Sequence, residues 1–141
     1  MNLELIFSLA NLFALVAWIL LIFAPRWTWT QKLVVFGGVS LGLSIGYLIL
    51  IVLFFGTSEG GFNSLAAVMK LFTNQNIALA GWIHYLAFDL FVGSWEVRDA
   101  QTRGISHWFV VPCLVLTFML GPVGFLAYYF IRLIVSRKGQ R

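Results

Sequence analysis

Charged residues and cysteine are scarce in this sequence. Only 10% of the 141 residues are charged, whereas 61% are hydrophobic. A soluble domain carries roughly a quarter of its residues as charged side chains on its surface, so the composition excludes an ordinary soluble domain. The single cysteine, Cys113, excludes a disulfide bond within the chain. The nine Lys and Arg residues form no basic stripe, which excludes nucleic acid as a partner.

The sequence also lacks the spacings typical of metal and nucleotide sites. His84, His107, Asp89, Glu96 and Asp99 are suitable ligand types, but no Glu-x-x-His or His-x-x-x-His pair is present. A glycine-rich phosphate loop and a Ser-His-Asp signature are missing as well. We therefore predict no metal and no other cofactor.

Long apolar segments are what the sequence has in quantity. A transmembrane helix needs roughly 20 mostly apolar residues, and four such segments fill most of the chain. The sequence predicts an all-α integral membrane protein, a single transmembrane helical domain over residues 1–141 that is a bundle of about four transmembrane helices. The expected helices cover about 3–24, 33–55, 77–95 and 107–135, with a short amphipathic surface helix at about 62–73 between the second and third.

Three details of these segments carry further expectations. Gly38, Gly42 and Gly46 repeat every four residues, which favours tight helix packing within the chain and, as the alternative, a homo-oligomer or membrane complex. The last segment contains Pro112 and the pair Gly121-Pro122, so it is either one kinked helix or two shorter ones. The first segment lacks a basic leader and a cleavage site, which indicates a retained helix rather than a signal peptide.

The third segment holds the polar residues that matter most. Asp89 lies near its middle, where an ionised carboxylate costs on the order of 3 kcal/mol. That cost requires a partner, a protonated state or a wet cavity. At 100° per residue, Tyr85, Asp89 and Glu96 share one stripe, whereas His84 lies about 140° around the helix from Asp89.

Ionisable residues cluster in and after this segment. Such a cluster is either a structural network or a functional site. On the functional interpretation, the residues of interest are Asp89, His84 and Glu96. Arg98, Asp99, Arg103 and His107 belong to the same cluster.

The same region carries a family resemblance over nearly the whole chain. The run Gly81-Trp82-Ile83-His84-Tyr85-Leu86-Ala87-Phe88-Asp89-Leu90-Phe91-Val92-Gly93 resembles the signature of the abscisic-acid-deficient-four-like family. Further matches are Glu96, Arg98-Asp99, Gly104-Ile105, His107, Pro112-Cys113 and Phe118-Met119-Leu120-Gly121-Pro122-Val123-Gly124. These are four-helix membrane proteins of plants, algae and cyanobacteria. Because this chain begins directly at its first helix, it resembles a cyanobacterial form, expected in a plasma or thylakoid membrane.

The resemblance implies a link to the xanthophyll neoxanthin, an allenic carotenoid formed from an epoxide. If an enzyme, the protein would be a carotenoid isomerase. A buried, protonated Asp89 would donate a proton to the epoxide oxygen, and His84 or Glu96 would accept one from the polyene. The resemblance thus implies catalytic roles for Asp89, His84 and Glu96. It also implies a slot for this substrate or pigment, lined by Trp82, Tyr85, Phe88, Phe91 and Trp95, with further substrate contacts from Arg98, Asp99, Arg103 and His107.

Other classes of function remain open from the sequence. The alternative to an enzyme is a non-catalytic membrane subunit, assembly factor or pigment-binding scaffold of a photosynthetic complex; a proton relay through Asp89 and Glu96 is a third. Orientation is also open. With four spans the two termini share one side, and four basic residues then face five across the membrane, which decides nothing.

Overall fold

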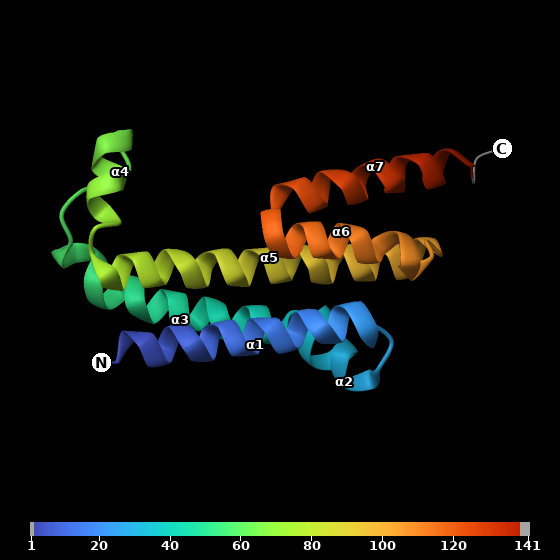
Figure 1. Cartoon of the computed structure of the whole chain (residues 1–141), viewed down its shortest axis with the longest axis horizontal. Helices are drawn as coiled ribbons and strands as arrows, with labels where there is room; N and C mark the ends of the chain where they lie inside the picture. The colour runs from blue at the N-terminus through green and yellow to red at the C-terminus, as the bar shows by residue number, and fades with distance from the viewer. Residues whose placement is uncertain (1, 139–141) are drawn as a thin grey trace.

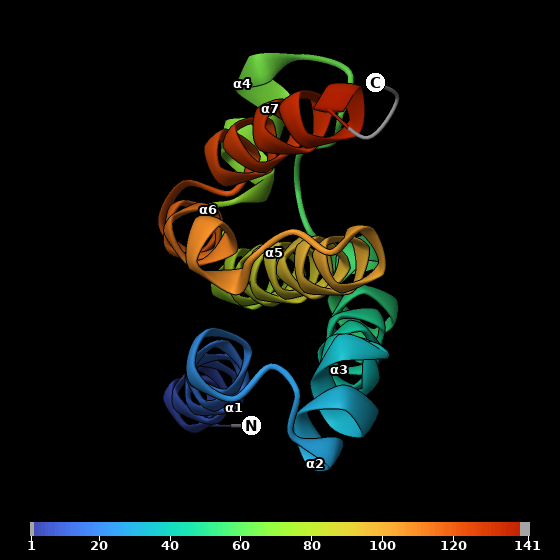
Figure 2. The ribbon, with the colours of Figure 1, turned by 90° about the vertical axis from the view of Figure 1, so that its right-hand side faces the viewer.

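A long central helix organises the protein. The computed structural model describes residues 2–138, with side chains for residues 2–135, and these residues form helices and no strand. Helix α5 (Gln75–Arg103) lies in the middle. Helices α1 (Leu3–Phe23) and α3 (Gly38–Phe54) pack on one side of it, and α6 (His107–Leu120) and α7 (Pro122–Lys138) lie on the other (Figures 1 and 2).

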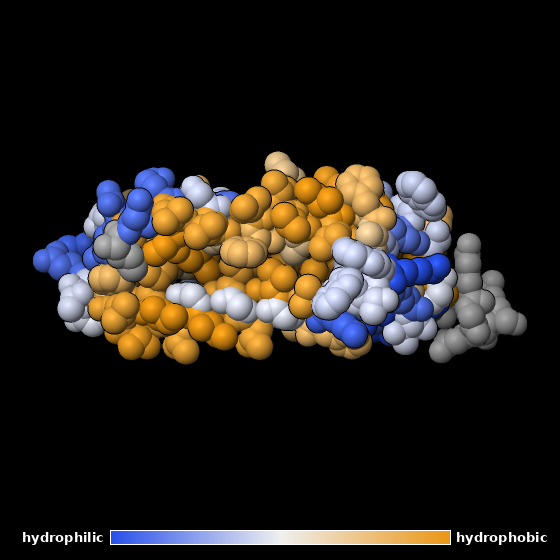
Figure 3. Space-filling view, turned by 90° about the horizontal axis from the view of Figure 1, so that it is seen from below, coloured by the Kyte–Doolittle hydropathy of each residue, from blue (hydrophilic) through white to orange (hydrophobic). Residues whose placement is uncertain are grey.

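The apolar surface confirms the predicted fold class. Three helical segments are long and apolar enough to cross a membrane, Leu3–Phe23, Thr28–Thr57 and Gln75–Arg103, and α6 and α7 are shorter apolar helices. Viewed from below, hydrophobic residues form a broad band between two polar ends (Figure 3). The protein is therefore an all-α membrane bundle.

Helix α1 begins at a side-chain cap and ends one residue before the predicted boundary. The Asn2 side chain accepts a hydrogen bond from the Leu5 amide at 3.1 Å, which satisfies one of the free N–H groups of the first turn. Ala24 and Pro25 follow the last turn, because proline disfavours a helical residue before it. Helix α1 buries a narrow stripe of small and large apolar residues: Ala10, Ala14, Ala17, Trp18 and Leu21.

The second spanning segment is less regular than the expected helix over 33–55. It consists of α2 (Thr28–Thr30), a π-helical turn η1 (Gln31–Val35), α3 and a 3₁₀ turn η2 (Phe55–Thr57). Gly37 separates η1 from α3 with φ of +88°, a left-handed conformation that a side chain disfavours. The glycine therefore resets the helix direction at this end of the bundle.

The predicted amphipathic helix is present and shorter than expected, as α4 (Leu65–Leu71). The Ser64 hydroxyl caps it by accepting a hydrogen bond from the Ala67 amide at 3.1 Å. Helix α4 lies at one end of the bundle, across the long axis (Figure 1). Its exposed Leu65 and Met69 side chains suit a helix that lies on the membrane surface.

Helix α5 extends past the predicted end at Trp95. The charged residues that we expected in a loop over 96–106 instead continue the helix to Arg103. The Asp99 carboxylate pairs with Arg103 one turn later, at 2.9 Å, which supports the last turn. Gly104 then ends the helix with φ of +66°, and its N–H bonds back to the carbonyls of Ala100 and Gln101.

The expected last helix over 107–135 is two helices that reverse direction. Helix α6 contains Pro112 without breaking, and the chain turns at Gly121, where φ is +47°. Helix α7 then runs back along α6 (Figure 1). The beginning of α1 and the end of α7 therefore lie at opposite ends of the bundle, not on one side as four full spans would require.

Glycines bring the two helices of this hairpin together. A Cβ atom at Gly124 would overlap the backbone nitrogen and hydroxyl of Thr117. Gly93 is similarly covered by the Trp18 ring. By contrast, no atom lies within 4 Å of where a Cβ would stand at Gly42 or Gly46, so the prediction of tight packing within the chain is wrong at these two positions.

The difference between these glycines is testable by alanine substitution. We expect Gly124→Ala to destabilise the protein by about 1–3 kcal/mol, because the new methyl group forces α6 and α7 apart. Gly46→Ala should be neutral or stabilising by about 0.5–1 kcal/mol, because it fills open space and favours the helix. Thermal unfolding of both variants in the same detergent measures this, and equal midpoints would contradict the close packing of the hairpin.

Candidate acid–base site at the hairpin tip

Asp89 lies where the hairpin turns. It is the central residue of α5, whose bounds are Gln75 and Arg103. A Cβ atom at Gly121 would come within 2.8 Å of Asp89 Oδ1, so the carboxyl group lies directly against the turn. Among the described side chains, no ion pair involves Asp89, and its buried Oδ2 has no hydrogen-bond partner. The tip therefore carries a half-buried carboxyl group that no cation neutralises.

Tyr85 connects Asp89 to the backbone of the turn. Its hydroxyl donates a hydrogen bond of 3.1 Å to the carbonyl oxygen of Phe118, and it interacts electrostatically with the Asp89 carboxyl group one turn along α5. A hydroxyl group has one proton to donate and lone pairs to accept with. While the Tyr85 hydroxyl donates its hydrogen bond to the Phe118 carbonyl, a protonated Asp89 can donate a hydrogen bond to the Tyr85 oxygen.

The start of α7 instead favours the ionised form of Asp89. Helix α7 begins at Pro122, immediately after the turn that contacts Asp89. The first turn of a helix carries a partial positive charge and stabilises a nearby carboxylate. Asp89 thus has surroundings that accommodate both its protonated and its ionised form, which is what a group that gives and takes a proton requires.

Glu96 lies on the same side of α5 but is sealed from the surroundings. Its side chain is 0% exposed, and Oε1 accepts a hydrogen bond of 2.9 Å from the Thr117 hydroxyl in α6. Oε2 is buried without a hydrogen-bond partner among the described residues. Glu96 therefore joins α5 to the hairpin, and no substrate can touch it in this conformation.

Asp99 anchors the other end of the hairpin. Its carboxylate accepts a hydrogen bond of 2.8 Å from Tyr128 and lies 3.0 Å from the Nε atom of Arg132, both in α7. Arg103 donates to the same carboxylate at 2.9 and 3.0 Å. The predicted substrate contacts Asp99 and Arg103 are thus members of a structural ion-pair cluster. The sequence offered no signal that Tyr128 and Arg132 would complete it.

His84 faces a different part of the bundle from Asp89. Its ring stacks on Phe88 at 4.7 Å and meets the edge of Tyr47 in α3 at 5.2 Å. A groove of about 600 Å³ lies along this same interface between α3 and α5. Its lining combines aromatic rings, glycine backbone and two serines: Lys32, Phe36, Gly37, Gly38, Ser40, Leu41, Ser44, Ala87, Phe88 and Phe91. His84 and Asp89 therefore face different neighbours, as their predicted separation of about 140° around the helix requires.

The remaining predicted substrate contacts do not meet in one slot. The Trp82 indole donates to Asn11 of α1 at 3.1 Å, whereas the Trp95 ring packs edge-on against Tyr128 of α7. His107 Nε2 lies 2.8 Å from the carbonyl oxygen of Ile22, where it joins α6 to the end of α1. Arg98 is exposed at the end of α5. The aromatic residues thus surround α5 and pack against three neighbouring helices.

Within residues 2–138, no three His, Cys, Asp or Glu side chains are close enough to hold a metal ion. Besides Tyr128 and Arg132, the polar residues that sequence reasoning missed are Thr117 and Ser40. The hydroxyl of Ser40 is buried without a hydrogen-bond partner among the described residues. Neither residue had a distinctive sequence spacing, so only the packing of the helices identifies them.

A family model described as ABA DEFICIENT 4-like matches residues 5–128. The chain belongs to this family. Searches of curated proteins and of solved structures gave no match. Membership of the ABA DEFICIENT 4-like family fits a role related to xanthophyll and neoxanthin biosynthesis.

The buried bond between Glu96 and Thr117 gives a test of the hairpin's attachment. We expect Thr117→Val to destabilise this ABA DEFICIENT 4-like protein by about 1–3 kcal/mol, because both oxygens of Glu96 are then buried without a donor. Thr117→Ser keeps the hydroxyl and serves as the matched control. Thermal unfolding in detergent measures both, and a Thr117→Val protein as stable as the control would contradict this attachment.

Proposed function

We propose that the protein isomerises an epoxy-carotenoid to an allenic carotenoid within the membrane, with Asp89 as the group that transfers protons. The observation that carries the proposal is the Asp89 carboxyl group at the hairpin tip, which forms no ion pair among the described side chains and whose Oδ2 is buried without a hydrogen-bond partner. An ionisable residue at membrane depth is expensive and is commonly functional. Membership of the ABA DEFICIENT 4-like family, which fits a role related to xanthophyll and neoxanthin biosynthesis, supports a carotenoid as the substrate.

The chemistry needs one proton donor and one acceptor and no redox partner. Protonated Asp89 gives its proton to the epoxide oxygen, and the C–O bond at the carbon next to the polyene breaks. The oxygen remains on the other ring carbon as a hydroxyl group. The Asp89 carboxylate then removes a proton from the first carbon of the chain, and the released electron pair forms the second of two adjacent double bonds. Asp89 returns to its protonated form, and no atom is gained or lost.

The surroundings of Asp89 suit both halves of this cycle. The start of α7 favours the carboxylate that exists after the first proton transfer. Tyr85 can orient the carboxyl group, because its hydroxyl is held by the Phe118 carbonyl. One residue thus serves as acid and base, which removes the need for a second catalytic group on the same face.

The other two predicted catalytic residues are less well placed for this reaction. Glu96 is completely buried behind the hairpin, and His84 packs beside the groove on the α3 side of α5. We therefore assign the proton transfers to Asp89 and a structural role to Glu96.

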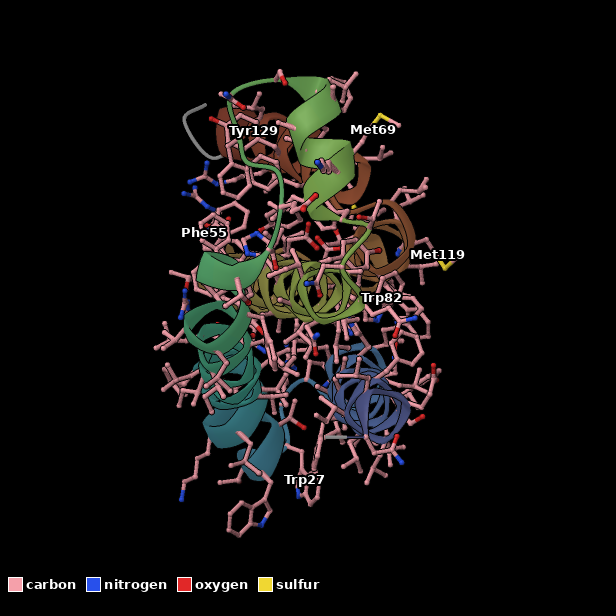
Figure 4. All side chains as sticks on the ribbon, turned by 90° about the vertical axis from the view of Figure 1, so that its left-hand side faces the viewer. Trp27, Phe55, Met69, Trp82, Met119 and Tyr129 are labelled. Atoms are coloured by element: carbon pink, nitrogen blue, oxygen red, sulfur yellow. The ribbon has the colours of Figure 1, made fainter. Side chains whose placement is uncertain are left out.

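A substrate dissolved in the bilayer can approach the hairpin tip laterally, from the surrounding lipid. Met119 and Leu120, which precede the turn, are both exposed, and Met119 points away from the bundle (Figure 4). These residues would contact lipid or a polyene rather than water. We infer a carotenoid-containing membrane, the plasma or thylakoid membrane of a photosynthetic bacterium such as a cyanobacterium, as the location.

The decisive experiment uses the purified protein in lipid vesicles that contain an epoxy-carotenoid. We expect the wild type to form an allenic isomer of unchanged mass, detected by chromatography and absorption spectroscopy. Asp89→Asn should lower the rate by at least about 100-fold, because the amide neither donates nor accepts the required proton. Tyr85→Phe should lower it by about 10-fold, since the carboxyl group loses an orienting contact.

Two controls separate this mechanism from its alternatives. Glu59→Gln changes a carboxylate in the exposed connector, where Lys70 lies 2.8 Å away, and should leave the rate unchanged. His84→Phe retains a ring beside Phe88 and should retain most activity; a loss equal to that of Asp89→Asn would instead identify His84 as the base. If Asp89→Asn forms product at the wild-type rate, the catalytic proposal is wrong and a non-catalytic membrane subunit becomes the better explanation.

A further inference from the structure

The hairpin of α6 and α7 reaches only halfway along the bundle. At 1.5 Å per residue, the 14 residues of α6 extend about 21 Å, whereas the hydrocarbon core is about 30 Å thick. Its turn lies against Asp89, the central residue of α5. Helix α7 then runs back beside α6, and Arg132 pairs with Asp99 near the end of α5 where α6 begins. The hairpin thus enters and leaves at one end of the bundle.

This return brings the basic residues together. Hydrogen bonds fix which segments share that end: Gln31 donates to Gln101 at 3.2 Å, and His107 lies 2.8 Å from the Ile22 carbonyl oxygen. Besides the fully buried Glu96, the charged side chains described at this end are five cations and one carboxylate, namely Arg26, Lys32, Arg98, Arg103, Arg132 and Asp99. Helix α7 continues past Arg132 to Lys138, so the backbone of Arg137 and Lys138 extends in the same direction. Arg141 and the side chains of Arg137 and Lys138 lie outside the described residues.

The opposite end has a different charge. Asn74 donates to Ser58 at 3.0 Å, and Glu4 and Gln75 line one pocket, which places the start of α1, the end of η2 and the start of α5 together. The charged side chains described there are Glu4, Glu59 and Lys70, two carboxylates and one cation. Four full spans would divide the basic residues almost equally between the two sides of the membrane. With the hairpin, every described basic side chain except Lys70 lies at one end of the bundle.

We infer that α6 and α7 form a re-entrant hairpin, that the protein crosses the membrane three times, and that its basic end faces the anionic lipid surface on the side from which the chain is inserted. Short loops rich in Lys and Arg are retained on that side, and anionic headgroups attract each nearby cation. Aromatic residues support this placement, since Lys32 lies 5.8 Å from the Trp29 ring and Trp27 projects away from the bundle (Figure 4).

Single-cysteine labelling in intact bacterial cells tests this arrangement. Cys113→Ser removes the native thiol, which is buried. Three reporters are then added one at a time: Asn63→Cys in the connector before α4, Thr102→Cys at the end of α5, and Ser136→Cys near the end of α7. With a membrane-impermeant maleimide, Asn63→Cys should label at least about fivefold more than the other two. After the cells are permeabilised, all three should label alike.

Each other pattern contradicts a stated part of the inference. Labelling of both Asn63→Cys and Ser136→Cys from outside, without Thr102→Cys, would show four full spans. Labelling of Thr102→Cys and Ser136→Cys without Asn63→Cys would show the reverse orientation. Both outcomes are independent of whether the protein is an enzyme.

A charge variant tests the cause of the orientation. The triple change Arg26→Gln, Lys32→Gln and Arg98→Gln removes three cations from the basic end and leaves the Asp99 cluster intact. We expect outside labelling of Asn63→Cys to fall by at least about twofold, as part of the protein inserts in the opposite direction. Lys70→Gln is the matched control and should leave labelling unchanged. Unchanged labelling of the triple variant would refute the role of the basic end.

Discussion

The fold depends on a chain reversal beside the middle of α5. Backbone polar groups inside a bilayer must find partners within the protein, because lipid offers none. The turn at Gly121 meets this requirement with few contacts: the Gly121 amide donates to the Thr117 carbonyl at 2.9 Å, and the Tyr85 hydroxyl donates to the Phe118 carbonyl at 3.1 Å. The polar side chains along α5 therefore serve, before any chemistry, to attach the half-length hairpin to α5.

The same contacts explain why the polar residues of α5 differ in role. Glu96 is enclosed by the hairpin and hydrogen-bonded to Thr117, and Asp99 is neutralised by two arginines. Asp89 lies beyond the last turn of α6, so the hairpin touches it without covering it. The residues that attach the hairpin and the candidate acid–base group Asp89 are thus separated by about two helical turns along one side of α5. This separation leaves Asp89 free to change its protonation state without breaking the ion pairs that hold α7.

The half-length hairpin also decides how charge is distributed along the bundle. A full last span would carry Arg132 to the end that holds Lys70. The reversal carries Arg132 to the end that holds Arg26 and Arg98 instead. One glycine with a positive φ therefore influences both the depth of the candidate site and the electrostatic difference between the two ends of the protein.

The sequence by itself determined that the chain is helical and membrane-embedded, because only apolar helices with internally bonded backbones suit such a composition. It also located Asp89 at mid-depth and separated it from His84, since residue spacing defines angles around a helix. Helix ends inside polar runs were not predictable: α5 passes through the expected loop because Asp99 pairs with Arg103. Spacing also could not say which helix faces which residue, or whether Gly121-Pro122 bends or reverses the chain. Those were decided by tertiary packing, in which Gly124 permits close contact with α6 and Thr117 bonds to Glu96.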